Sequence, residues 1–404
     1  MNDYDVAVVG GRAAGASTAL LLARAGLRVA VLERSPVGSD TVSTHALMRA
    51  GVLQLSRWEV LPALVAAGTP PVRSIDFAHP DGATAHVSLR PSPGVDALYA
   101  PRRHLLDRVL VEAAAAAGAD VLHGTSVTGL LRDDDGRVLG VRAAGPDGRD
   151  AGVRAALTVG ADGVGSLVAR ETGARTLGRG TEASALLYRY VSDLPVRGYV
   201  WAYGDGAAAG LIPTNAGETC VFVSTTPARM RTLRREGTAG AFERLLDAVP
   251  ATVSDTVRSG GAGGRIHGWR GLPGYVRRPY GPGWALVGDA GYFRDPITTH
   301  GLTDALRDAE LLSEAVLAGI DGSSPEAALA GYQLTRDRLS HALAAVTESV
   351  CRYDWDSDGI RTLLRRASSA MSDEVEHLSA RLPPHPAVVG TSRGHPRPSS
   401  SRDT

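Results

Sequence analysis

The chain has 404 residues, which is long enough for two or three domains that each bury a core. Its 43 basic and 43 acidic residues give a formal net charge of zero, so no overall field favours nucleic acid or an anionic membrane as a partner. Apolar residues make up 44% of the chain, but their runs are too short for a membrane span, and a predicted strand leaves no room for a signal peptide at the N-terminus. We therefore expect a cytoplasmic protein without a membrane span.

The sequence contains no lysine, so all 43 basic residues are arginine. A guanidinium group keeps its proton near neutral pH. Reactions that need a catalytic lysine, such as Schiff-base and pyridoxal chemistry or P-loop phosphate transfer, are therefore excluded. The two cysteines, Cys220 and Cys351, do not have the spacing of metal ligands, and we expect no metal site.

Residues 5–33 predict a βαβ unit: a short apolar strand, a glycine-rich turn at residues 10–15, a helix and a second strand that ends at Glu33. The helix N-terminus after such a turn can bind a pyrophosphate, and an acidic residue about 20 positions further on can bind a ribose hydroxyl. Arg12 stands where the G-x-G-x-x-G fingerprint has its second glycine, and we expect its side chain to point away from the phosphates or to pair with them. The candidate cofactor-binding residues of this unit are Gly10, Gly11, Arg12, Ala14, Gly15, Glu33 and Arg34.

The rest of the chain alternates between predicted strands and helices. Residues 71–90 predict a β-hairpin that turns at Asp81-Gly82, and residues 100–117 predict a helix. A second hairpin over residues 127–143 precedes a strand that runs into Gly160-Ala-Asp-Gly163. Longer alternating strands between residues 183 and 225 predict an antiparallel sheet. After helices between residues 227 and 259, a short buried strand ends at Gly288-Asp289, and further helices are expected over residues 303–318, 325–353 and 360–378.

Three of these turns carry a resemblance to a known family. The glycine turn at residues 10–15, Asp162-Gly163 and Gly288-Asp289, followed by Thr299-His300-Gly301, resemble in order and spacing the FAD-dependent aromatic hydroxylase superfamily. That superfamily also includes geranylgeranyl reductases and tryptophan-halogenase-like enzymes. The resemblance covers residues 3–350 and implies FAD as cofactor, with NAD(P)H as a transient reductant. It also implies a small-molecule substrate, a monomer or homodimer, and a separate flavin reductase as a candidate partner.

The resemblance assigns roles to individual positions. Arg103 matches an arginine that the family places near the FAD phosphates, and Val127 falls where the family's backbone meets the adenine. Asp162 matches the D-G motif, and Asp289 matches the aspartate that binds ribityl or ribose hydroxyls. A helix N-terminus that faces the pyrimidine end of the flavin completes the implied site, because it would stabilise the negative charge of the reduced ring. Its residues are Gly288, Pro296, Gly301 and Leu302.

The implied fold class is α/β: a Rossmann-like FAD-binding domain with an inserted antiparallel β-sheet substrate domain and C-terminal helices. We assign residues 1–182 and 284–320 to the FAD-binding domain and residues 183–283 to the substrate domain. Residues 321–382 then form the C-terminal helices. The tail, residues 383–404, is rich in Pro, Ser, Arg and Gly, and we expect it to be disordered.

Departures from the family pattern suggest the catalytic residues. His45 and His300 stand on segments expected to border the flavin ring, where either could act as an acid or base, donate a hydrogen bond to the flavin, or tether it covalently. The alternative is that each histidine only satisfies local backbone groups. On the predicted sheet, aromatic side chains could line a substrate pocket or simply pack. The candidate substrate residues are Tyr188, Trp201, Tyr203 and Pro213.

The choice of reaction follows from these residues. The superfamily's halogenases depend on an active-site lysine, which this chain lacks, so halogenation is disfavoured. We favour a monooxygenase that transfers one oxygen atom from O2 to an aromatic or polyketide-like secondary metabolite. The alternative is a flavin-dependent reductase or dehydrogenase of a prenyl or other natural-product substrate. That branch usually has a cysteine-glycine element where this chain has Ser43-Thr44-His45. A non-catalytic carrier on the same fold is a second alternative.

Overall fold

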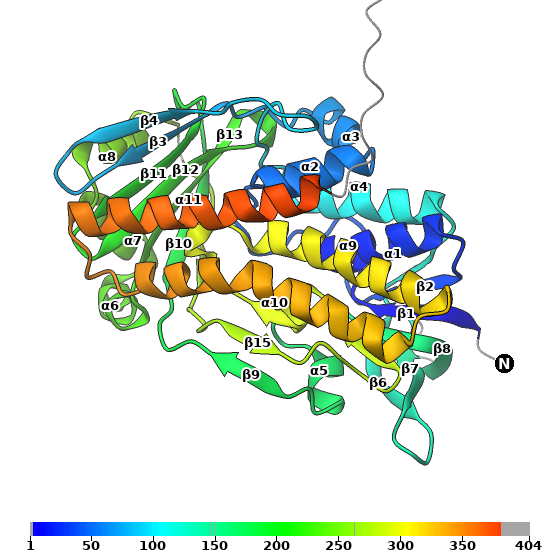
Figure 1. The fold of residues 1–404 in the computed structure, drawn as a ribbon. Helices are drawn as coiled ribbons and strands as arrows, with labels where there is room; N and C mark the ends of the chain where they lie inside the picture. Colours follow the sequence, from blue (N-terminus) through cyan, green and yellow to red (C-terminus); the bar gives the residue numbers. More distant parts are fainter. Residues whose placement is uncertain (1–2, 147, 149, 262, 381–404) are drawn as a thin grey trace, which may run out of the picture.

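The computed structural model describes residues 3–146, 148, 150–261 and 263–380. It confirms the α/β fold class: two large sheets are accompanied by long C-terminal helices (Figure 1). The predicted tail, residues 383–404, lies outside the described residues. The residue boundaries that we assigned to the domains stay predictions.

The first sheet is built on five parallel strands in the spatial order β5–β2–β1–β8–β17. Val9 of β1 and Leu286 of β17 both lie opposite Gly160 of β8. Because the strands are parallel, the turns that follow them meet at the same edge of the sheet. The strands of this sheet are β1 (Tyr4–Val9), β2 (Val29–Glu33), β5 (Asp120–His123), β8 (Asp150–Gly160) and β17 (Trp284–Leu286), with antiparallel additions from β6 (Ser126–Arg132), β7 (Val138–Ala144) and β16 (Tyr280–Gly281).

Helices pack closely around this sheet. The first helix, α1 (Ala13–Arg24), carries buried alanines at positions 16, 19 and 23, whose small side chains allow neighbouring elements to approach. It contacts α4 (Arg103–Ala116) and α9 (Gly301–Ile320), so a helix from residue 301 onward lies against the N-terminal βαβ unit. The shorter helices of this part are α2 (Arg49–Arg57), α3 (Leu61–Ala66) and α5 (Leu167–Glu171).

The second sheet has the order β14–β10–β13–β12–β11–β3–β4. Its four central strands are antiparallel, as the sequence predicts. The predicted hairpin of residues 71–90 joins this sheet as β3 and β4, and β3 runs parallel to β11, so the sheet is mixed and draws on residues well before position 183. Its strands are β3 (Ser74–Ala78), β4 (Thr84–Ser88), β10 (Ala185–Ser192), β11 (Tyr199–Gly204), β12 (Ala207–Pro213), β13 (Glu218–Thr225) and β14 (His267–Trp269).

Alternation along these strands gives the second sheet two buried faces. Leu187, Val221 and Val223 belong to a core that includes side chains of α7 and α8. Tyr188 and Phe222, one position away, belong instead to the main core with the first sheet. The sheet therefore separates its own helical layer from the part of the molecule that holds the three turns. The helices of this layer are α6 (Pro227–Leu233), α7 (Thr238–Asp247) and α8 (Ala251–Arg258).

Two long helices complete the fold. α10 (Pro325–Val350) packs against α9, and α11 (Ser357–Ser379) packs against α10 and α2. Figure 1 shows α10 and α11 running beside each other from the second sheet toward the first. A small third sheet joins β9 (Thr176–Arg179), β15 (Tyr275–Arg277) and β18 (Tyr292–Phe293). Within the described ranges, no helix has the length and apolar character needed to cross a membrane.

Candidate active site

The three predicted turns converge in space. Gly10 has φ +101°, and a Cβ atom placed on it would lie 2.6 Å from the carbonyl oxygen of Ala161, in the turn that contains Asp162. A Cβ on Gly288 would lie 2.9 Å from the Cβ of Ala14. The turns after β1, β8 and β17 therefore touch one another, and glycine is needed where two of them meet.

A cleft of about 310 Å³ lies where these turns meet α9 and the second sheet. Several residues predicted from different parts of the sequence line it together: Arg12, Ala14, His45, Arg103, Tyr188, Asp289, Pro296, Gly301 and Leu302. Sequence reasoning did not single out Ser43, Trp269, Phe293 or Arg294, which also line it. The cleft thus combines a polar end near α1 with an apolar, aromatic wall from the second and third sheets.

Glu33 closes the glycine turn from the side. Its carboxylate accepts hydrogen bonds from the backbone amides of Gly11 at 2.7 Å and Ser35 at 2.8 Å. Burial alone would raise the pKa of Glu33, but these amide hydrogen bonds hold it below its usual value, so the group is ionised. An ionised acceptor at the end of β2 is what a ribose hydroxyl requires. Arg34, directly after it, is exposed.

Arg12 and Arg103 share one carboxylate, that of Asp107. Asp107 accepts from Arg12 at 3.2 Å, from Arg103 at 3.1 Å and from the amide of Ala13 at 3.1 Å. Arg12 is therefore directed away from the glycine turn, as one of the two expected alternatives predicts, while it still borders the cleft. Asp107 was missed by the sequence reasoning, although it follows Leu106 of the R-x-x-L segment directly.

The Asp289 carboxyl group is half-buried on the cleft wall. Burial raises the pKa of Asp289 to about 7; Arg103 opposes this rise, and Asp304 and Asp308 add to it. No donor within the described part of the chain forms a hydrogen bond with this carboxyl group. A buried acceptor without a donor is costly unless a ligand supplies one. The hydroxyls of a ribityl chain are suitable donors, so this residue fits the cofactor that the sequence implies.

Other predicted cofactor residues lie beside the cleft rather than on it. Asp162 accepts hydrogen bonds from the amides of Leu167 at 2.6 Å and Val168 at 3.3 Å, so it stabilises the start of α5. Its second oxygen is buried and has no protein partner. Gly15 packs tightly, since a Cβ there would lie 1.9 Å from the oxygen of Gly10. Val127 lies in β6 and packs against a core cluster that includes residues of β1 and β2.

His45 lines the cleft with an unusual backbone. Its φ of 47° is positive, and the side chain is 2% exposed. The Nδ1 atom lies 3.1 Å from the carbonyl oxygen of Ser43, so Nδ1 carries the proton and Nε2 is an acceptor without a protein partner. Burial lowers the pKa of His45 to about 3, which keeps the ring neutral. A neutral acceptor fits a hydrogen-bonding role better than the acid or base role considered from sequence.

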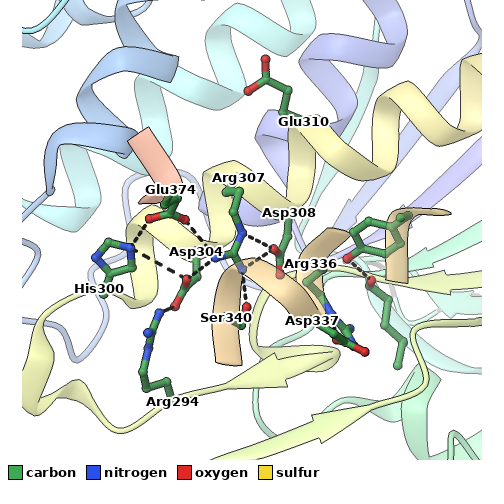
Figure 2. A network of polar contacts seen from close by, with 12 residues as sticks. Arg294, His300, Asp304, Arg307, Asp308, Glu310, Arg336, Asp337, Ser340 and Glu374 are labelled. Atoms are coloured by element: carbon green, nitrogen blue, oxygen red, sulfur yellow. Dashed lines mark hydrogen bonds and ion pairs between the residues drawn. The ribbon is translucent and has the colours of Figure 1, made fainter. Parts of the chain in front are cut away.

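His300 occupies a different place from the one expected. Its ring is 1% exposed, does not line the cleft, and points to Glu374 of α11, with Nε2 and Oε2 2.6 Å apart (Figure 2). Only the backbone after it, at Gly301 and Leu302, reaches the cleft. The physical reason is that His300 directly precedes α9, where its side chain turns inward to a buried set of charges. A direct catalytic role for His300 is therefore not supported by its position.

Of the four predicted substrate residues, the structure places only Tyr188 on the cleft. Its ring stacks on His267 at 5.0 Å, and Trp269 and Phe293 form a second aromatic pair at 6.0 Å. Trp201 instead packs on Phe222, and Tyr203 meets Trp355 edge-on. The fourth, Pro213, pairs with Thr219 inside the second sheet. These three residues are buried by sheet packing, so their side chains are not available to a ligand in this cleft.

A parallel sheet with a glycine-rich turn, two further turns at the same edge and a donor-seeking aspartate defines an FAD-dependent oxidoreductase fold. The comparisons agree: the chain belongs to the FAD binding domain family, whose model matches residues 3–349. It is 29% identical over 360 residues to digeranylgeranylglycerophospholipid reductase 2 of Methanopyrus kandleri, covering 82% of this chain and 81% of that protein. The enzyme of the same name from Methanothermobacter thermautotrophicus is 26% identical, with 79% of each chain covered.

Solved structures with the same fold come from several flavoprotein groups. PqsL of Pseudomonas aeruginosa, in complex with 2-aminobenzoylacetate, matches with a TM-score of 0.73 and 23% identity over 91% of this chain and 99% of that one. A triple mutant of the flavin-dependent brominase Bmp2 reaches a TM-score of 0.78 at 18% identity, covering 92% and 94%. A geranylgeranyl bacteriochlorophyll reductase-like protein of Thermoplasma acidophilum reaches 0.72 at 21%, covering 93% and 98%. At these identities the likeness establishes the fold alone.

Proposed function

We propose that this FAD-dependent oxidoreductase is a monooxygenase that acts on a small aromatic or polyketide-like molecule. The observation that carries the proposal is the wall of the cleft next to Pro296. Rings from three separate elements, Tyr188 of β10, Trp269 of β14 and Phe293 of β18, line it together. Such a wall binds a flat ring by stacking and keeps water away from it.

The residues of the cleft divide the work of binding and orientation. Glu33 and Asp289 would hold the sugar and ribityl hydroxyls of FAD, and the N-terminus of α9 would face its ring. When bound, FAD supplies the centre that accepts hydride from NAD(P)H and reacts with O2. His45 offers a neutral acceptor at Nε2, which can hold a donor N–H or O–H without changing its own charge. The aromatic wall positions the substrate and excludes water.

A reductase of a prenyl substrate is the second candidate. The named activity of the curated relatives, which cover about four fifths of the chain, favours it. Against it stands the lining of the cleft, in which Ser43-Thr44-His45 replaces the cysteine-glycine element of that branch and neither cysteine takes part. The absence of lysine argues against the third chemistry, halogenation, in spite of the brominase fold.

Isotope-labelled O2 separates these reactions. The FAD-loaded protein is mixed with NADPH and a panel of aromatic acids, phenols and one geranylgeranyl lipid, with bromide present. We expect one labelled oxygen atom in an aromatic product and NADPH oxidation that the same compound stimulates. A saturated lipid formed without O2 uptake would establish the reductase instead, and a brominated product would establish halogenation. A yellow protein that turns over none of the panel would favour a non-catalytic carrier.

A matched pair of variants tests the aromatic wall. Trp269→Ala removes a ring from the cleft, whereas Trp355→Ala removes a ring that packs on Tyr203 away from it. Loss of a stacking partner costs roughly 1 kcal/mol, so KM should rise about fivefold or more in the first variant. Turnover by Trp355→Ala should keep the wild-type KM. Equal KM values in both variants would contradict the assigned substrate position.

A further inference from the structure

A set of buried charged side chains, which we call the α9 ion network, joins α9 to α10 and α11 (Figure 2). Each member is at most 5% exposed at its side chain, and the members come from segments far apart in the sequence. Charges buried this deeply are stable only when paired and hydrogen-bonded. The network consists of Arg294, His300, Asp304, Arg307, Asp308 and Glu374.

Glu374 is the contribution of α11 to this network. One oxygen lies 2.6 Å from Nε2 of His300, and the other accepts from Arg307 at 2.9 Å. Arg307 in turn binds Asp304 at 2.8 Å and the hydroxyl of Ser340 in α10 at 3.0 Å. Both oxygens of a single carboxylate therefore hold residues of α9, and one of them is the residue that directly precedes this helix.

The start of α9 depends on these contacts. His300 accepts the first hydrogen bond of the helix, from the amide of Asp304 at 2.9 Å, while Gly301 and Leu302 line the cleft. The residue before it, Thr299, has φ 53°, a strained conformation for a side chain that is not glycine. A strained turn followed by a glycine keeps one orientation only if side-chain contacts fix it. His300 and Arg307 provide those contacts, and Glu374 holds both.

Metal binding by the same residues is the other reading of this cluster, because His300, Asp304 and Glu374 present ligand-type atoms close together. Each carboxylate is already occupied by a guanidinium group: Asp304 pairs with Arg294 and Arg307, and Glu374 pairs with Arg307. A cation would have to displace these arginines. The contacts thus describe an ion network rather than a metal site.

We propose that Glu374 is a positioning residue that fixes the cleft-facing turn of α9 through His300 and Arg307. The proposal rests on the FAD-dependent function above, because this turn is the part of α9 that would face the flavin ring. It also assigns α11, which contributes nothing to the cleft lining, a role in catalysis at a distance.

Glu374→Gln tests this role, with Glu310→Gln as the matched control. Glu310 is also a buried acid whose contacts tie α9 to its neighbours, but it binds Gln54 and Arg57 and lies outside the network (Figure 2). We expect hydrogen exchange at the amides of Asp304 and Ala305 in the apoprotein to become about tenfold faster in Glu374→Gln and to stay unchanged in Glu310→Gln. Equal effects of both substitutions, or no effect of either, would overturn the proposal.

Turnover gives a second, independent measurement. A misplaced turn weakens alignment more than substrate binding, so kcat should fall about tenfold in Glu374→Gln while KM stays within about twofold. His300→Gln should reproduce this effect, and the double variant should add nothing, because both act through one contact. Additive effects would contradict the shared route. If Glu374→Gln fails to fold, Glu374→Asp, which keeps the charge but shortens the reach, is expected to show smaller changes of the same kind; wild-type exchange and kcat in Glu374→Asp would count against the proposal.

The two experiments fail separately. Amide exchange is measured without FAD or substrate, so selective loosening of α9 in a protein that oxygenates nothing would refute the proposed monooxygenase and leave the positioning of α9 by Glu374 standing. Normal oxygenation with unchanged exchange would refute only the positioning role.

Discussion

At the scale of single residues, Asp289 shows how the cleft prepares for a ligand. Burial raises the pKa of Asp289 to about 7 from its unfolded value of 3.8, because no protein donor compensates the charge. Between these two values the folded apoprotein binds more protons than the unfolded chain. Stability therefore falls as the pH rises through this window, and the group is ready to accept hydrogen bonds from hydroxyls.

Asp289→Asn should remove this pH dependence. An amide at position 289 carries no charge, so the free energy of unfolding of the apo variant should exceed that of the wild type by on the order of 1–3 kcal/mol at about pH 8 and match it near pH 4. Thermal unfolding over this range measures the difference. The same substitution should weaken FAD binding, since the amide offers one acceptor fewer. An identical pH dependence in wild type and variant would contradict the role of Asp289.

His45 should remain neutral at every pH at which the protein is folded. Its pKa is lowered to about 3 by burial, so the ring nitrogens of isotope-labelled His45 should show no titration in NMR spectra between about pH 5 and 8. The exposed ring of His86, paired with Asp76, provides an internal comparison that should titrate. A titration of His45 near its ordinary pKa would show that the imidazole reaches solvent and can act as an acid or base.

Sequence reasoning found the cofactor residues better than their partners. Glu33, Asp289 and Arg103 belong to short motifs whose spacing is fixed by the turn they occupy. Asp107 and Glu374 carry no such local signal: Asp107 acts because α4 lies against α1, and Glu374 because α11 lies against α9. Contacts between distant helices set their roles. His300 was misplaced for the same reason, since its partner lies 74 residues away.

At the scale of elements, the glycine turn after β1 is the tightest part of the site. Gly15→Ala would place a Cβ 1.9 Å from the oxygen of Gly10, so either the turn or α1 must shift. We expect the variant to lose FAD binding and about 3 kcal/mol or more of stability. Gly26→Ala is the control: its φ is +87°, but nothing lies within 4 Å of the added atom, so only backbone strain of about 1 kcal/mol is expected. Similar losses in both variants would show that the close approach is unimportant.

The elements themselves were largely predictable. The βαβ unit, both hairpins, the four central strands of the second sheet and the last three helices follow from apolar periodicity and turn residues. The partner of the first hairpin did not follow: strands β3 and β4 have partly or fully exposed side chains and no pattern that names a neighbour. Their pairing with β11 is settled only by the packing of the two halves of the molecule.

At the scale of the whole molecule, the cleft exists because two sheets and the C-terminal helices meet there. The first sheet contributes the turns, the second contributes Tyr188 and Trp269, and α9 closes the site between them. α10 and α11 then hold α9 from outside (Figure 1). A site assembled from this many distant segments explains why single motifs indicated FAD but left the substrate open.

The most direct test of this account is a crystal structure of the protein with FAD. We expect one FAD molecule extended from Glu33 past Ala14 and Asp289, with its ring against residues 296–302 and an open space beside Tyr188, Trp269 and Phe293. FAD bound away from the three turns, or a ring position filled by side chains of the second sheet, would contradict the shared cleft on which the proposed chemistry depends.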